Sequence, residues 1–142
     1  MNRTFACHTI CGGPSPDRVI RGQALVSRDP VCFYMIDAET GTIIEKGHDL
    51  EGQTITGKIL VIPSGKGSSV VQDEGLFALK EKSTGPSAIV VAAPDTVLVA
   101  GALVMEFPIF DRVEPRFYEF LENGGDIDIR ADKGEIYIHK SF

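Results

Sequence analysis

The chain has no tryptophan, few cysteines and no excess of positive charge. Its 142 residues include three cysteines, 14 Lys and Arg, and 20 Asp and Glu, for a formal net charge of −6. A broad nucleic-acid surface needs clustered Lys and Arg, so this charge balance argues against a nucleic-acid partner. An odd number of cysteines cannot all pair, and we expect reduced thiols at Cys7, Cys11 and Cys32.

A long hydrophobic run is also missing. The most apolar stretch, 89–104, is interrupted by Pro94, Asp95 and Gly101, and it is too short to span a bilayer. Residues 1–5 contain no apolar run of the kind that a signal peptide needs. These features predict a cytoplasmic protein with no membrane partner.

What the chain does contain is typical of a globular domain. Hydrophobic residues make up 43% and charged residues 24% of the sequence. A chain of 142 residues is long enough to bury its own core. We therefore predict a single domain over residues 1–142, of the α/β class and rich in strands.

Most of the predicted elements follow from alternation, apolar runs and turn residues. Two pairs of predicted strands are joined by tight turns, one pair in the first half and one at the C-terminal end. The predicted strands are 3–10, 19–26, 31–36, 42–45, 58–63, 88–92, 108–110, 126–130 and 135–139. The predicted helices are 69–82 and 114–122, and 95–106 fits either a short buried helix or a strand.

The middle of the chain predicts a right-handed β-α-β unit, in which the run 58–63 is buried and the helix 69–82 covers the sheet. On that helix we expect Val70, Phe77 and either Leu76 or Lys80 to face the core. Gln72 and the two acidic residues after it are expected to face solvent.

The loop between this strand and helix is the most informative segment for chemistry. Gly65, Lys66, Gly67, Ser68 and Ser69 lie where a helix start exposes free N–H groups and the positive end of its dipole. Glycines let a ligand approach the backbone, and Lys66 adds a cation. The loop therefore predicts a binding site for the anionic end of a small substrate. The alternative is that Ser68 only caps the helix and the glycines only shape the turn.

Other familiar sites are not supported by the residues. The order Gly-Lys-Gly differs from a P-loop, in which Lys is followed by Ser or Thr, and no Gly-x-Ser-x-Gly elbow occurs. Cys7, His8 and Cys11 do not have a zinc-ligand spacing, and no metal site is predicted in this chain. Asp111 and Arg112 form either a surface ion pair or part of a crevice.

The order of segments along nearly the whole chain resembles the small subunit of the aconitase X family. The similarity is carried by these blocks: 22–27, Phe33, Ile36-Asp37, 39–41, His48, Gly52, 57–61, Pro63-Ser64-Gly65-Lys66-Gly67-Ser68-Ser69, 85–89, Gly101-Ala102, Pro108-Ile109 and 111–113. The Pro-x-Gly-x-Gly-Ser block, with Gly-Ala after the next strand, is its most specific part. Residues 33–37, Phe-Tyr-Met-Ile-Asp, depart from the Phe-Trp-Gly-Gly-Val-Asp that is frequent in the family.

The resemblance implies a swivelling β/β/α domain and a hydro-lyase that works only with an aconitase-like large subunit. It implies no cofactor on this chain and an iron–sulphur cluster in that partner, whose iron would take the departing hydroxyl. Ser68 matches the serine that acts as catalytic base. Gly65, Lys66, Gly67 and Ser69, together with Arg112, are then expected to bind the substrate.

The implied substrate is 5-phosphomevalonate or cis-3-hydroxy-L-proline, with a slight preference for phosphomevalonate because of the segment 108–134. A rival of another class is a non-catalytic anion-binding or regulatory module on the same fold. A phosphohistidine carrier would need a His at a helix start, and the sequence around His48 does not provide that context.

Overall fold

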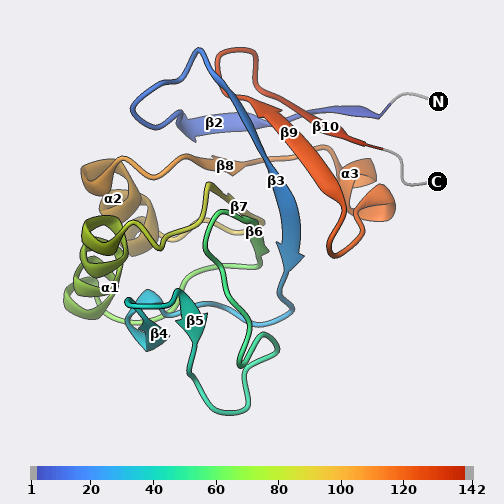
Figure 1. Ribbon diagram of the computed structural model, residues 1–142. Helices are drawn as coiled ribbons and strands as arrows, with labels where there is room; N and C mark the ends of the chain where they lie inside the picture. The colour runs from blue at the N-terminus through green and yellow to red at the C-terminus, as the bar shows by residue number, and fades with distance from the viewer. Residues whose placement is uncertain (1–2, 140–142) are drawn as a thin grey trace.

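The structure, a computed structural model, describes residues 3–139 and is organised around one eight-stranded mixed sheet (Figure 1). The strand order is β1-β10-β9-β3-β6-β7-β8-β2, and β4 pairs with β5 in a separate hairpin. The strands are β1 (Thr4–Ala6), β2 (His8–Cys11), β3 (Val19–Val26), β4 (Ile36–Asp37), β5 (Thr42–Ile43), β6 (Ile59–Ile62), β7 (Ala88–Val91), β8 (Ile109–Asp111), β9 (Asp126–Arg130) and β10 (Glu135–Ile138).

The helices are α1 (Ser69–Lys82), α2 (Thr96–Met105) and α3 (Pro115–Phe120), with a 3₁₀ turn η1 over Phe33–Met35. The predicted range 69–82 is confirmed, and the ambiguous segment 95–106 is a helix. Within residues 3–139, no helix is long and apolar enough to cross a membrane.

The N-terminal segment closes the sheet on itself. β1 pairs with β10 at one edge and β2 pairs with β8 at the other, although only Cys7 separates them. The predicted continuous strand 3–10 is therefore wrong. The chain must bend at Cys7 to change partner, and the N–H of Cys7 donates to the carbonyl of Gly134 at 2.9 Å instead of to a neighbouring strand.

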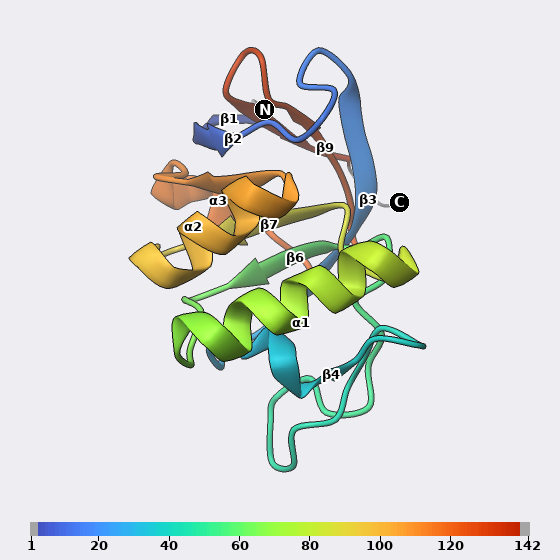
Figure 2. The ribbon, with the colours of Figure 1, turned by 90° about the vertical axis from the view of Figure 1, so that its left-hand side faces the viewer.

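β6 and β7 are parallel and buried on both faces, which confirms the predicted β-α-β unit. Ile59 and Val61 face a core inside the curled sheet, while Leu60 and Ile62 face a second core under the helices. In Figure 2, α1 and α2 lie side by side over this second core. The domain thus has three layers, as the swivelling β/β/α class requires.

The face of α1 that packs inward differs from the prediction. Gln72, Gly75, Leu76 and Leu79 are buried, whereas Val70 is 63% and Phe77 54% exposed. Val70 and Phe77 are hydrophobic, and this favours a place in the core. Because η1 and α2 pack against neighbouring sides of α1, a different side of the helix is buried.

Gln72 explains why the predicted strand 31–36 is wrong. Its side-chain oxygen accepts the N–H of Phe33 at 2.7 Å, and its side-chain nitrogen donates to the carbonyl of Val31 at 3.3 Å. These hydrogen bonds occupy the N–H of Phe33 and the carbonyl of Val31, which a neighbouring strand would otherwise bind. Only Val31 makes a strand-like bridge, to Gly65, before the chain turns into η1.

Gly75 allows η1 to approach α1 so closely. A Cβ at this position would lie 2.5 Å from the carbonyl oxygen of Phe33. Gly→Ala inside a helix normally stabilises by about 1 kcal/mol. Here overpacking against backbone should outweigh that gain, because neither element can move freely.

We therefore expect Gly75→Ala to lower the free energy of unfolding by roughly 1–3 kcal/mol. The measurement is urea unfolding followed by circular dichroism. Glu74→Ala, at the exposed neighbouring position, is the control and should change stability by less than about 0.5 kcal/mol. A Gly75→Ala variant more stable than the parent chain would contradict this account.

Candidate active site

The glycine-rich loop lies at the carboxyl ends of the parallel strands β3, β6 and β7. The chain leaves β6 to enter α1 and leaves β7 to enter α2, so both helices begin at the same edge of the sheet (Figure 2). Ligands of open α/β sheets bind outside the carboxyl ends of the strands. This edge is therefore where a substrate site is expected.

Gly65 is fixed by a carboxylate from the second crossover. Its N–H donates to Asp95 Oδ2 at 3.0 Å, and the other oxygen of Asp95 accepts the N–H of Leu98 at 2.9 Å. A Cβ on Gly65 would lie 2.9 Å from the same carboxylate. The N–H of Gly65 is therefore not free to bind a substrate. The contribution of Gly65 to the site is that Asp95 can pack closely against a residue without a side chain.

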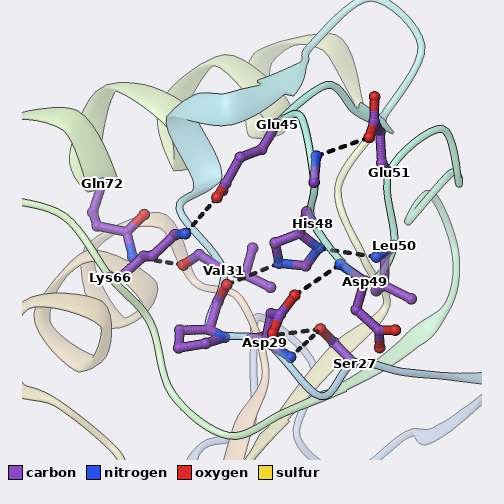
Figure 3. A network of polar contacts seen from close by, with 12 residues as sticks. Ser27, Asp29, Val31, Glu45, His48, Asp49, Leu50, Glu51, Lys66 and Gln72 are labelled. Carbon is purple, nitrogen blue, oxygen red and sulfur yellow. Dashed lines mark hydrogen bonds and ion pairs between the residues drawn. The ribbon is translucent and has the colours of Figure 1, made fainter.

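Gly67 and Lys66 occupy the exposed part of the loop. Gly67 has φ +113°, a conformation that side chains rarely adopt, and a Cβ there would approach Val71 at 2.9 Å and Cys32 Sγ at 3.3 Å. The ammonium of Lys66 forms an ion pair with Glu45, drawn in Figure 3. The positive charge of Lys66, which the sequence predicts to bind the substrate, is therefore balanced by the carboxylate of Glu45.

Ser68 and Ser69 are exposed at the start of α1. Ser68 is the N-cap residue by position, and its carbonyl accepts the N–H of Gln72 at 3.0 Å. Its side chain makes no capping hydrogen bond. The hydroxyl is therefore not used for capping, which removes the main structural reason for a serine at this position.

A network of polar contacts lies beside the loop (Figure 3). Val31 receives the N–H of Lys66 at 3.0 Å and donates to the carbonyl of Ser64 at 3.1 Å. His48 is buried, with Nε2 2.9 Å from the carbonyl of Pro30 and Nδ1 accepting the N–H of Leu50 at 3.0 Å. Both ring nitrogens are occupied, so His48 is a structural clamp and is not available as a phosphate carrier.

Four supporting residues were missed by sequence reasoning: Glu45, His48, Gln72 and Asp95. Only Asp95 had a readable signal, because an Asp after Pro94 and before an apolar segment is typical of an N-cap. The others reach the loop from distant segments, and no local pattern indicates that.

Arg112 lies at the same edge but is not next to the loop. It follows β8, and β7 separates β8 from β6. Its Nε is 3.8 Å from Asp111, whose buried carboxylate also meets His8 Nδ1 at 2.7 Å. The buried carboxylate of Asp111 therefore pairs with the half-exposed His8, which the sequence did not predict, and Arg112 projects beside it.

Cys7 lies near this pair, and its chemistry excludes a thiolate. Burial, followed by the negative charges of Asp111 and Glu135, raises the pKa of the Cys7 thiol to about 11. Metal ligation and nucleophilic attack both need the thiolate. Within residues 3–139, no group of three or more His, Cys, Asp or Glu side chains could hold a metal ion.

The aconitase X swivel domain family matches residues 5–138. The chain belongs to the aconitase X family. It is 37% identical over 120 residues to the phosphomevalonate dehydratase small subunit of Methanosarcina mazei, covering 84% of this chain and 83% of that protein. The small subunit of the same name from Pyrococcus horikoshii is 39% identical over 121 residues, covering 84% and 87%.

A solved structure gives the same assignment. The crystal structure of Thermococcus kodakaraensis aconitase X in its holo-form superposes with a TM-score of 0.84 at 34% identity, covering 98% of this chain and 100% of that chain. The predicted fold class and the family resemblance are therefore confirmed.

The two helix starts at this edge allow a matched comparison. Asp95 uses its side chain as a cap and also holds Gly65, whereas Ser68 does not use its hydroxyl for capping. We expect Asp95→Ala to lower the free energy of unfolding by about 2 kcal/mol, from the lost cap and the orphaned N–H of Gly65. Ser68→Ala should change it by less than about 0.5 kcal/mol. Equal losses in thermal unfolding of the two variants would contradict the assignment.

Proposed function

We propose that this chain is the small subunit of a two-subunit dehydratase that acts on 5-phosphomevalonate, with Ser68 as the catalytic base. The observation that carries the proposal is the exposed Ser68 hydroxyl, free of capping, at the start of α1 in a member of this family. Several archaeal relatives, 32–39% identical, are named phosphomevalonate dehydratase small subunit, which supports the choice of substrate.

The proposed reaction removes a proton from the carbon next to a carboxylate and expels hydroxide from the neighbouring carbon. Ser68 Oγ would accept that proton. A serine is a poor base unless its deprotonated form is stabilised, and the free N–H groups of the first turn of α1 and its dipole supply positive potential at this point. The substrate carboxylate would approach the backbone at Gly67 and Ser69, where the loop is open.

The partner completes the site in this proposal. The departing hydroxide needs a Lewis acid, which an iron–sulphur cluster supplies when bound. Residues 3–139 offer no ligand group for it, so we assign the cluster to the aconitase-like large subunit. We place the assembled enzyme in the cytoplasm.

A second candidate substrate is cis-3-hydroxy-L-proline. The ion pair between Lys66 and Glu45 favours it, because no unpaired cation then remains on the loop for a phosphate. A non-catalytic anion-binding module would use the same helix start without needing the Ser68 hydroxyl. Substitution of Ser68 therefore distinguishes the enzyme from the module.

We expect Ser68→Ala to reduce kcat of the assembled enzyme by on the order of 10²–10⁴ and to leave assembly intact, because a lost base affects the transition state. The measurement is steady-state turnover together with size-exclusion chromatography of the complex. Ser15→Ala, in an exposed loop, is the control and should keep full activity. A Ser68→Ala enzyme with near-normal kcat would leave the module as the better explanation.

The isolated chain should be folded, inactive and free of iron, because its core is complete and it lacks a ligand set. Reconstitution with the large subunit and iron should give dehydration of 5-phosphomevalonate in preference to cis-3-hydroxy-L-proline. The measurements are iron analysis of the purified chain and product formation from each compound. Stoichiometric iron that is lost on replacing Cys7 and Cys11 would contradict the assignment of the cluster to the partner.

A further inference from the structure

A buried carboxylate holds an exposed histidine at the end of β8. Asp111 has a side chain only 7% exposed, and its Oδ1 is 2.7 Å from Nδ1 of His8, whose side chain is 54% exposed. An ionised carboxylate can only accept, so Nδ1 carries a hydrogen. The opposite ring nitrogen, Nε2, makes no hydrogen bond or ion pair with any residue in the range 3–139. It is therefore available to a ligand.

Arg112 stands beside this pair in an unfavourable backbone conformation. Its φ is +49°, in the left-handed region that a non-glycine residue rarely adopts. Its side chain is 81% exposed, and its contact with Asp111 is a loose 3.8 Å. Strained residues gather at functional sites, and here the strain presents a guanidinium next to the imidazole of His8.

Strand register places both side chains at the edge that carries Ser68. Ile62, at the end of β6, pairs with Val91, and the preceding residue of β7, Val90, pairs with Phe110. Asp111 follows Phe110 and pairs with His8, so the ends of β6, β7 and β8 lead from the glycine-rich loop to His8. Adjacent strands are about 4.8 Å apart, which puts β8 roughly 10 Å and β2 roughly 14 Å from β6 along the sheet. His8 cannot reach the carbon that Ser68 deprotonates.

The distance between His8 and the glycine-rich loop distinguishes two roles for His8, proton transfer and substrate binding. A second proton-transferring group would have to lie within hydrogen-bond reach of the reacting atoms. Anion-binding side chains at this distance fit the non-reacting end of an elongated substrate. Phosphomevalonate carries its phosphate at the end remote from its carboxylate.

Charged groups around His8 and Arg112 decide whether a phosphate can bind. The guanidinium of Arg112 is a fixed positive charge beside the carboxylate of Asp111, and the His8 ring adds a hydrogen-bonding nitrogen. The Glu114 carboxylate accepts the N–H of Ala6, two residues before His8, at 3.1 Å. The Cys7 thiol is neutral because its pKa is raised to about 11. Glu135 is the remaining carboxylate that faces Cys7.

We propose that His8 and Arg112, positioned by the buried carboxylate of Asp111, bind the phosphate of the substrate while the Ser68 loop binds its carboxylate end. The inference rests on the proposed function, and it assigns the preference for a phosphorylated substrate to this chain. It also accounts for a loop whose own lysine is already paired with Glu45.

The decisive variants are His8→Asn and Arg112→Gln in the reconstituted complex. An Asn amide keeps the donor to Asp111 and removes only the outward nitrogen. We expect kcat/KM for 5-phosphomevalonate to fall on the order of ten- to a hundred-fold, the value of a charged hydrogen bond, with less than about threefold change for unphosphorylated mevalonate. Equal losses on both compounds, or no loss on either, would overturn the proposal.

The chain provides a matched control pair elsewhere on the sheet. His139 and Arg21 both contact Asp128, at 3.1 and 3.5 Å, and the His139 side chain is 46% exposed. His139→Asn and Arg21→Gln therefore remove the same groups without touching the proposed site. They should leave the preference for the phosphorylated compound unchanged.

A binding measurement separates this inference from the proposed function. Inorganic phosphate is titrated into the complex while the imidazole resonances of the histidine-labelled small subunit are followed. His8 should shift, Arg112→Gln should weaken the response about tenfold, and buried His48 should stay still. This readout holds even if the complex dehydrates neither compound, a result that would defeat the proposed function alone. A His8 signal that does not respond to phosphate would overturn the inference.

Discussion

Burial of β6 and β7 on both faces is the constraint on which the rest of the structure depends. The runs 59–62 and 88–91 are apolar at every position, so each strand needs cover on two sides. The curled sheet supplies one cover, and α1 with α2 supplies the other. Parallel strands covered in this way must be joined by crossovers, and both crossovers then begin at one edge. The position of the site follows from that geometry.

Side chains from distant segments hold the glycine-rich loop at this edge. Asp95 binds Gly65 across the gap between the two crossovers, and Gln72 ties the first turns of α1 to the segment around Val31. These bonds fix the loop through its backbone, and the Ser68 side chain makes no capping hydrogen bond. A side chain at a helix start that makes no capping hydrogen bond is suited to a catalytic role, since the positive potential there favours an anion.

The charged side chains differ between the two ends of the sheet edge that carries the glycine-rich loop. Near the loop, Lys66 is balanced by Glu45, whereas Arg112 and His8 stand at the far end around one buried carboxylate, Asp111. In the binding mode proposed above, a substrate with two anionic ends would meet helix N–H groups at one end and the side chains of Arg112 and His8 at the other. The large subunit would then supply what this edge lacks, namely the metal chemistry.

The sequence by itself determined most of the elements and their order, because local signals carry that information. Alternation gave β3 and the C-terminal hairpin, the apolar runs gave the buried parallel strands, and the residues 63–69 gave both the loop and the family resemblance. Only the tertiary structure decided which arc of α1 is buried, since the positions of η1 and α2 set it and left Phe77 outside. It also decided the break at Cys7 and the pairing of His8 with Asp111, which lie 103 residues apart. Contacts between distant segments depend on strand register and closure of the sheet, and no local pattern encodes them.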